Sequence, residues 1–209
     1  MILIIDHGQG NIGSLRNTLD NLEIKNTVIN SDQTTIDYNL IGGFILPGVG
    51  TFNSGMKEMR KRGLDNLVYK LRDKGVKGMG ICLGMQMLCE KSAEDNYLED
   101  GLGIFPGTFE KLSKTNDKVP NIGWNITTSK TSDTTNNSLE SFLNETFYYI
   151  HSYGHKEVED PSVISTFNHG KEKIAAALYG DNILGVQFHP EKSQGAGLAL
   201  LNEYFNEDK

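Results

Sequence analysis

The chain has few cysteines, few prolines and no long hydrophobic run among its 209 residues. Its two cysteines, Cys82 and Cys89, lie seven residues apart, and without an export signal we do not expect them to form a structural disulfide. The opening apolar run ends at Asp6 and has no basic leader, which argues against a secretory signal. No segment approaches the ~20 apolar residues needed to span a bilayer. We therefore expect a cytoplasmic protein that makes no contact with a membrane.

Positive charge is also scarce. The chain carries 20 Lys and Arg against 27 Asp and Glu, which gives a net charge of −7. Because nucleic acids are bound by clustered basic side chains, we do not expect a nucleic acid partner. Hydrophobic residues make up 37% of the chain and charged residues 22%, a balance typical of globular proteins. A chain of this length can bury a substantial core, and we expect it to need neither a metal nor a cofactor.

Short apolar runs alternate with helical patterns through the first half of the chain. Strands are predicted at residues 1–5, 26–29, 44–46 and 76–81, and helices at 12–22, 56–74 and directly after Cys82. This periodicity is typical of βαβ units. It favours a parallel sheet covered by helices.

The pattern changes after about residue 98, where the strands become more polar. A Ser-, Thr- and Asn-rich stretch at 127–138 predicts an exposed loop. Further strands are predicted at 147–152, 163–167, 174–178 and 183–188, followed by an amphipathic helix at 197–205. No repeat or linker divides the chain. We therefore expect an α/β fold with a central, mostly parallel sheet flanked by helices, β-rich additions in the second half, and one domain over residues 1–209.

The sequence Gly80-Ile81-Cys82-Leu83-Gly84 lies where an apolar strand passes into a helical segment. This G-x-C-x-G pattern is typical of a nucleophile elbow, in which the flanking glycines let neighbouring backbone pass the nucleophile. The helix N-terminus would favour a thiolate, and the N–H of Leu83 would donate to an oxyanion. On its own, however, a cysteine between glycines on a buried strand is more often a small core residue.

A base for Cys82 is available near the C-terminus. The run VQFHPE at 186–191 ends another apolar strand, so His189 and Glu191 would emerge at the sheet edge where α/β proteins build their sites. His189 would take the thiol proton and return it to the leaving amine, while Glu191 would fix the tautomer of the imidazole. The alternative is that His189 is an ordinary strand-end histidine. The elbow makes that interpretation the weaker one.

Two motifs resemble the signatures of the class I, or triad, glutamine amidotransferases: GICLGMQ at 80–86 and GVQFHPEKS at 185–193. Further blocks resemble the glutaminase subunits of imidazole glycerol phosphate synthases, namely ILPGVGTF at 45–52, VPNIGWN at 119–125, YIHSY at 149–153 and the extended GVQFHPEKSQGAG at 185–197. The resemblance implies the class I glutamine amidotransferase fold. It also implies that Cys82, His189 and Glu191 hydrolyse L-glutamine to glutamate and ammonia.

The resemblance assigns further roles around the nucleophile. A backbone N–H at Val49 would complete the oxyanion hole with Leu83 after a peptide rearrangement, which glycines permit. The residues implied in binding the substrate are Gly48, Gly50, Gln86, His151, Ser152 and Tyr153. Without the resemblance, PGVG at 47–50 would be interpreted as an ordinary β-turn and Gln86 as a solvated helix position.

A glutaminase on its own would waste ammonia, so an acceptor enzyme is expected. The resemblance implies a heterodimer with a (β/α)8-barrel synthase, whose channel would shield ammonia from water on its way to imidazole glycerol phosphate and AICAR in histidine biosynthesis. The residues implied at that interface are Asn11, Asn121, Trp124 and Tyr148. As simpler alternatives, Trp124 would be a core residue and the asparagines turn formers.

The first loop, DHGQGNIGSL at 6–15, departs from the pattern of the histidine-pathway subunits. It resembles a paralogous branch whose barrel partner amidates a sugar of surface polysaccharides. The glutaminase chemistry would be unchanged. The acceptor therefore stays open between the two at this point.

A competing interpretation comes from the same loop. Residues 8–13 satisfy G-x-G-x-x-G after a strand and before a helix, with Asp32 about 20 residues further on. This would predict dinucleotide binding, but Asp6 would place a carboxylate beside the pyrophosphate. A catalytically silent scaffold is disfavoured because Cys82, His189 and Glu191 occur together. Other enzymes with a cysteine elbow, such as related peptidases, are not expected to combine it with both motifs.

Overall fold

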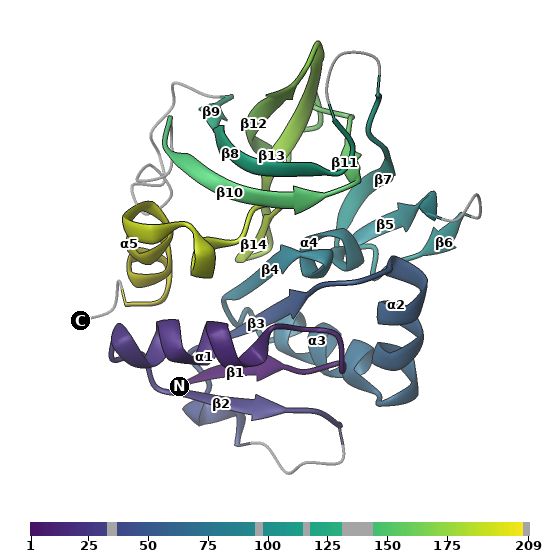
Figure 1. Cartoon of the computed structure of the whole chain (residues 1–209). Helices are drawn as coiled ribbons and strands as arrows, with labels where there is room; N and C mark the ends of the chain where they lie inside the picture. Colours follow the sequence, from purple (N-terminus) through teal and green to yellow (C-terminus); the bar gives the residue numbers. More distant parts are fainter. Residues whose placement is uncertain (33–36, 95–97, 115–117, 131–143, 207–209) are drawn as a thin grey trace.

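The computed structural model describes residues 1–32, 37–94, 98–114, 118–130 and 144–206 (Figure 1). Its centre is an eight-stranded sheet in the order β2-β1-β3-β4-β14-β13-β12-β9. In that order the strands are Asn26–Ile29, Ile2–Ile5, Gly43–Gly48, Gly78–Cys82, Ile183–Val186, Glu172–Gly180, Val163–His169 and Thr128–Ser129. The first five are parallel and the last three are added antiparallel. The predicted fold, mostly parallel with β-rich additions, is confirmed.

Helices cover both faces of this sheet. Successive side chains of a strand point to opposite faces, so Ile2 and Ile4 of β1 join one apolar cluster while Leu3 and Ile5 join the other. Helices α1 (Ile12–Asn21) and α5 (Gln194–Asn206) cover the first face, and α2 (Phe52–Lys61) and α3 (Leu64–Asp73) cover the second. Among the described residues, no helix is long and apolar enough to cross a bilayer.

The single helix predicted at 56–74 is wrong. The segment forms two helices, α2 and α3, which are separated by Arg62 and Gly63. Gly63 has a φ of 68°, a left-handed conformation that ends a helix and that glycine adopts without a steric penalty. The apolar period continues across the break, which is why it suggested one helix. The actual first helix also begins earlier, at Phe52.

The predicted loop at 127–138 lies largely outside the described residues. The part that is described contains β9, Thr128–Ser129, which pairs with β12. The expectation of a loop is therefore wrong for these two residues, and the expectation of exposure is wrong for Thr127, which is fully buried. Nothing further follows for residues 131–138.

The second half also builds two smaller sheets. One is a four-stranded sheet in the order β11-β7-β5-β6, whose strands are Tyr153–His155, Phe105–Lys111, Cys89–Ser92 and Glu99–Asp100. The other is an antiparallel ribbon of β8 (Asn121–Ile126) and β10 (Thr146–His151), which lies at the front of the upper part of Figure 1. Short helices complete the chain: η1 (Tyr38–Leu40), α4 (Leu83–Leu88) and η4 (Pro190–Lys192).

One face of the β8–β10 ribbon is exposed and apolar. Alternation along β8 leaves Ile122, Trp124 and Ile126 exposed by 57%, 48% and 62%. They lie opposite Ile150, Tyr148 and Thr146 of β10, and the rings of Trp124 and Tyr148 meet edge to face. Exposed apolar side chains gathered in this way are typical of a protein interface.

Candidate active site

Cys82 is the last residue of β4 and directly precedes α4. Its φ of 52° and ψ of −109° fall outside the regions that an L-residue adopts without strain, at a cost of roughly 1–3 kcal/mol. Leu83 is the first residue of α4, so its N–H has no acceptor within the helix. The predicted nucleophile elbow is therefore confirmed as a backbone conformation.

The glycines on either side of the elbow are required by close packing. A Cβ on Gly84 would lie 1.7 Å from the carbonyl oxygen of Leu46 in β3, and one on Gly80 would lie 2.9 Å from the backbone nitrogen of Met85. At Gly84 the crowding atom is backbone, and at Gly80 the Leu88 side chain adds a contact at 2.5 Å to the backbone one, so a Cβ at either position would require its neighbours to shift. The G-x-C-x-G spacing thus lets α4 turn back against β3 and β4.

His189 and Glu191 follow the strand next to Cys82. Strand β14 runs parallel to β4 with Val186 opposite Ile81, so the segment after Val186 reaches the same sheet edge as Cys82. His189 Nδ1 lies 2.8 Å from Glu191 Oε1, and both side chains are almost completely buried. A carboxylate accepts only, so Nδ1 carries the proton in this pair.

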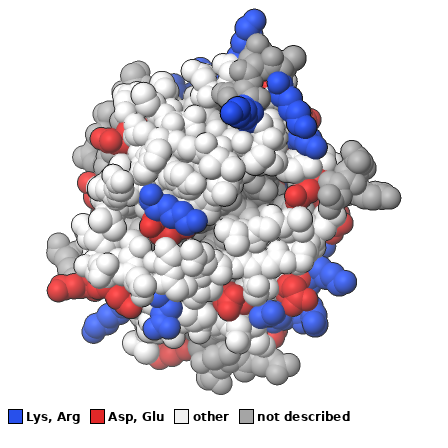
Figure 2. Space-filling model, in the orientation of Figure 1, with Lys and Arg blue, Asp and Glu red and all other residues white. Residues whose placement is uncertain are grey.

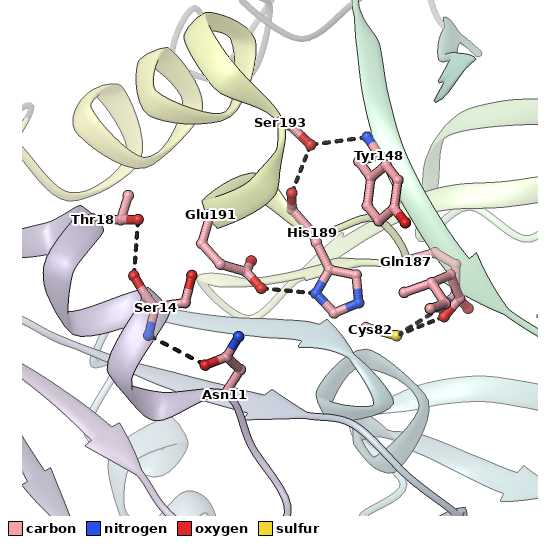
Figure 3. A network of polar contacts seen from close by, with 10 residues as sticks. Asn11, Ser14, Thr18, Cys82, Tyr148, Gln187, His189, Glu191 and Ser193 are labelled. Atoms are coloured by element: carbon pink, nitrogen blue, oxygen red, sulfur yellow. Dashed lines mark hydrogen bonds and ion pairs between the residues drawn. The ribbon is translucent and has the colours of Figure 1, made fainter. Parts of the chain in front are cut away.

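The Cys82 sulfur lies beside the edge of the His189 ring (Figure 3). Nε2 of His189 has no hydrogen-bond partner among the described residues, and the sulfur instead lies 3.8 Å from the carbonyl oxygen of Ile150 and 3.7 Å from Gln187 Nε2. Burial disfavours the imidazolium, but Cys82 and Glu191 favour it more strongly and raise the pKa of His189 to about 10. The arrangement can therefore hold a proton on His189 next to the sulfur.

A cavity of about 290 Å³ opens over the sulfur. The predicted site residues that line it are Val49, Gly50, Cys82, Leu83, Gln86, His151, Ser152 and Tyr153. Gly48 does not line it but packs under it, because a Cβ there would lie 2.8 Å from Leu83 Cβ. His189 and Glu191 are not among the residues that line it. The cavity is of a size suited to one small substrate.

Five further residues at the site were not predicted from the sequence. Glu94, Pro120, Ile150 and Lys192 line the cavity, and Gln187 bonds both Cys82 and, at 3.3 Å, the amide of Gln86. Gln187 and Lys192 lie within the GVQFHPEKS motif, which could have suggested them. Glu94 accepts a hydrogen bond from the N–H of Phe52 at the start of α2, a contact between distant segments that no local pattern signals.

The segment at 47–50 is held by the loop after β1. The N–H of Val49 donates to the carbonyl of Gln9 over 2.9 Å, and His7 Nε2 donates to the carbonyl of Pro47, also over 2.9 Å. His7 is completely buried, and burial lowers its pKa. The Val49 N–H is therefore already occupied in this conformation.

The residues expected at a partner surface lie in different surroundings. Trp124 and Tyr148 lie on the exposed face of the ribbon, which disfavours a core role for Trp124. Asn11 is exposed and its side chain accepts from Ser14 N at the start of α1 (Figure 3). Asn121 is only 9% exposed, and its amide donates to His151 Nε2 over 3.1 Å. Its side chain thus faces the interior of the chain.

The glycine-rich loop at 8–13 does not offer an anion site. Gly8 N donates to the Asp6 carboxylate over 2.8 Å, so that N–H is taken by a negative charge. The guanidinium of Arg62 beside Gly8 is paired with Glu58 over 3.2 Å, and the Asp32 carboxylate packs against Gly63. These contacts disfavour dinucleotide binding. Among the described residues, no group of three or more His, Cys, Asp or Glu side chains could hold a metal ion, and both cysteines are free.

Comparison with known proteins identifies the fold and the family of the chain. The family model of the class-I glutamine amidotransferases matches residues 3–206. The structure of PurLQS from Thermotoga maritima superimposes with a TM-score of 0.75 at 19% identity, covering 100% of this chain and 98% of that one. The glutaminase domain of Trypanosoma brucei CTPS superimposes with a TM-score of 0.60 at 14% identity, over 100% and 94% of the two chains. The fold and the matched family define a class I glutamine amidotransferase.

Sequence relatives narrow this class. Imidazole glycerol phosphate synthase subunit HisH of Listeria monocytogenes serotype 4a is 38% identical over 205 residues, which cover 98% of this chain and 94% of that protein. HisH of Oceanobacillus iheyensis is 38% identical and HisH of Chlorobaculum tepidum is 35% identical, each over 98% of both chains. The chain therefore belongs to the HisH family of class I glutamine amidotransferases.

Proposed function

We propose that the chain hydrolyses L-glutamine to L-glutamate and ammonia. The observation that carries this proposal is the meeting, at the ends of two adjacent parallel strands, of a cysteine at a strained elbow and a buried histidine–carboxylate pair. Strain of this kind persists where the surrounding structure enforces it, and it is concentrated at functional sites. Family membership supplies glutamine as the substrate.

The chemistry uses the triad in two stages. Cys82 attacks the carboxamide carbon of glutamine, and His189 transfers the thiol proton to the leaving amine, which departs as ammonia. Water then attacks the thioester with His189 as the base, which releases glutamate and restores the thiol. Glu191 keeps the proton on Nδ1 and stabilises the imidazolium between these transfers.

Two backbone N–H groups form the proposed oxyanion hole. That of Leu83 lies at the start of α4, where the helix favours negative charge. That of Val49 donates to Gln9 in the observed conformation, so its use requires the Gln9 bond to break. Gly48 and Gly50 on either side of Val49 provide the conformational freedom for such a change.

The cavity provides the proposed substrate site. Gln86 lines it and is 6% exposed. His151, Ser152 and Tyr153 also line it, and their backbone is proposed to flank the amino-acid head group. Glu94 adds a carboxylate to the lining, opposite in charge to the substrate's α-ammonium group. The cavity thus combines an apolar lining with a few polar groups, which is typical of sites for small molecules.

We further propose that residues 1–209 act as one cytoplasmic glutaminase domain within a heterodimer. The relatives are named as subunits of imidazole glycerol phosphate synthase, and the proposed partner is a (β/α)8-barrel synthase that uses the ammonia to make imidazole glycerol phosphate and AICAR. Its docking surface is the apolar face of β8 and β10. Figure 2 shows this face largely white, with most charged side chains at its margins.

The test of the chemistry is glutamate release from glutamine by the chain together with its barrel partner. Cys82→Ala is expected to abolish release, by a factor of about 10⁴ or more, with an unchanged unfolding transition. Full turnover by Cys82→Ala would refute the proposal.

Growth of a strain lacking its own HisH on medium without histidine tests the acceptor. Failure to restore growth despite active glutaminase would favour the sugar-amidating alternative.

A further inference from the structure

Strand β10 has one edge that pairs with no strand among the described residues. It pairs with β8 through its other edge, over the whole of Thr146–His151. The backbone groups of Tyr148 and Ile150 point away from β8. A strand edge of this kind normally binds water or another strand. Here, catalytic residues take that place.

Three hydrogen bonds join this edge to the catalytic histidine. His189 N donates to the Tyr148 carbonyl over 2.9 Å. Tyr148 N donates to the Ser193 hydroxyl over 2.9 Å, and that hydroxyl donates to the His189 carbonyl over 2.6 Å. Figure 3 shows Ser193 between the two backbones. Ser193 is 1% exposed, so these bonds are shielded from water.

The position of His189 explains why such support is needed. Strand β14 ends at Val186, so the sheet ladder no longer fixes the backbone at His189. The following residue, Pro190, provides no N–H. Buried backbone groups require partners, and those of His189 find them in β10, in Ser193 and in the N–H of Lys192.

We propose that Ser193 is a positioning residue, whose buried hydroxyl fastens the backbone of His189 to the free edge of β10. The catalytic imidazole then holds its place relative to Cys82, because Ile150 on the same edge offers its carbonyl to the sulfur. One strand edge thus supports both the nucleophile and the base. Only the catalytic part of this inference rests on the proposed glutaminase function.

The same strand provides the apolar face. Side chains alternate along β10, so Tyr148 and Ile150 present their side chains at the exposed face while their backbones bond the active site. A protein bound at that face therefore contacts the residues that hold His189 and Cys82. Displacement of β10 by such a partner changes the distance between base and nucleophile.

The test compares three variants in the full chain. Ser193→Ala removes the hydroxyl and Ser193→Thr retains it. Ser165→Ala is the matched control, since Ser165 is also fully buried but its hydroxyl has no partner among the described residues. With the barrel partner present, Ser193→Ala is expected to lower kcat on the order of 10²-fold with little change in KM, while Ser165→Ala stays near the wild type.

A second readout separates positioning from general stability. The titratable groups that interact with His189 are Cys82 of β4, Glu191 of η4 and His151 of β10. Loss of alignment with Cys82 and Glu191 is expected to lower the pKa of His189, measured by NMR, by on the order of one unit in Ser193→Ala. Ser193→Thr is expected to restore it. A His189 titration in Ser193→Ala that matches Ser165→Ala, or equal titrations in the Ala and Thr variants, would overturn the proposal.

Amide exchange in the wild-type chain gives a measurement that needs no variant. The Tyr148 N–H is expected to exchange as slowly as the amides of β10 that pair with β8, because Ser193 accepts from it. Rapid exchange would also overturn the proposal. Neither NMR measurement requires glutamine or partner. If the wild type released no glutamate, the proposed function would fail while these two readouts still decided the role of Ser193.

Discussion

The nucleophile and the base lie at the ends of adjacent strands but are held in different ways. Cys82 is fixed by backbone crowding within β3, β4 and α4, where Gly80 and Gly84 leave no room for side chains. His189 lies beyond the end of β14 and is fixed by hydrogen bonds from β10, a strand about 40 residues earlier in the chain. The elbow is therefore held by close packing of backbone against backbone, and the base by hydrogen bonds to a strand of another sheet.

This difference assigns different tasks to the two regions. A closely packed backbone has few alternative arrangements, so the elbow can store strain at Cys82 without yielding. Hydrogen bonds between separate elements can be lengthened at a smaller cost. Apart from the change proposed at Val49, adjustment of the triad is therefore expected at His189 rather than at Cys82, because β10, which holds His189, also carries the exposed apolar face.

The largest effect expected in this comparison is on glutamine hydrolysis, when the support of His189 alone is removed. Glu191→Gln removes the carboxylate that favours the imidazolium, so the pKa of His189 falls and glutamine hydrolysis drops roughly 10³-fold. The raised pKa also stabilises the wild type below about pH 6.5, and this contribution is lost as pH rises toward about 10. Chemical denaturation between pH 6 and 10 should therefore show a weaker pH dependence in Glu191→Gln. An identical pH dependence in both proteins would contradict the assignment.

Gly84→Ala disrupts the close packing of the elbow that holds Cys82. Its Cβ would overlap the Leu46 carbonyl, so we expect a loss of about 3 kcal/mol in the free energy of unfolding. Gly13→Ala in α1 is the control, because no heavy atom lies within 4 Å of its Cβ and alanine favours a helix by up to ~1 kcal/mol. Urea denaturation measures both. Similar values for the two variants would show that the elbow tolerates expansion.

The smallest expected effect is on the stability of the chain at low pH, and it arises from His151 of β10. His151 donates from Nδ1 to the Tyr153 carbonyl and accepts from Asn121, and burial lowers its pKa to about 4. The unfolded chain therefore binds more protons between pH 6.5 and 4, so stability falls as pH decreases through that range, by roughly 2 kcal/mol at pH 4.5. His151→Gln should show a smaller fall in urea denaturation. Some fall remains because the pKa of His7 is lowered as well. An undiminished fall would exclude His151 as the source.

The regularly patterned parts of the molecule were predictable from the sequence. The parallel strands, the elbow at Cys82 and the position of His189 at a strand end all follow from short motifs whose geometry is set by neighbouring residues. The break at Gly63 was missed, because the apolar period continues through it and a single glycine does not always end a helix. Local pattern thus predicts elements more reliably than their boundaries.

The remaining site residues depend on contacts between distant segments. Glu94 reaches the cavity from beyond β5, and Ile150 contributes through its carbonyl, which every residue type possesses. Asn121 is the first residue of β8, whose other face is exposed and apolar, yet its amide points inward and donates to His151. Such roles arise from the path of the backbone in three dimensions, which hydrophobic periodicity does not report.

The free edge of β10 has a consequence for how the family can diversify. The bonds from residues 148 and 150 to the active site use only backbone atoms, so almost any side chain can occupy these positions without removing them. Proline at 148 is the exception, because it lacks the N–H that Ser193 accepts. The outward side chains of the proposed docking face can therefore change without loss of the backbone bonds that hold His189 and contact Cys82.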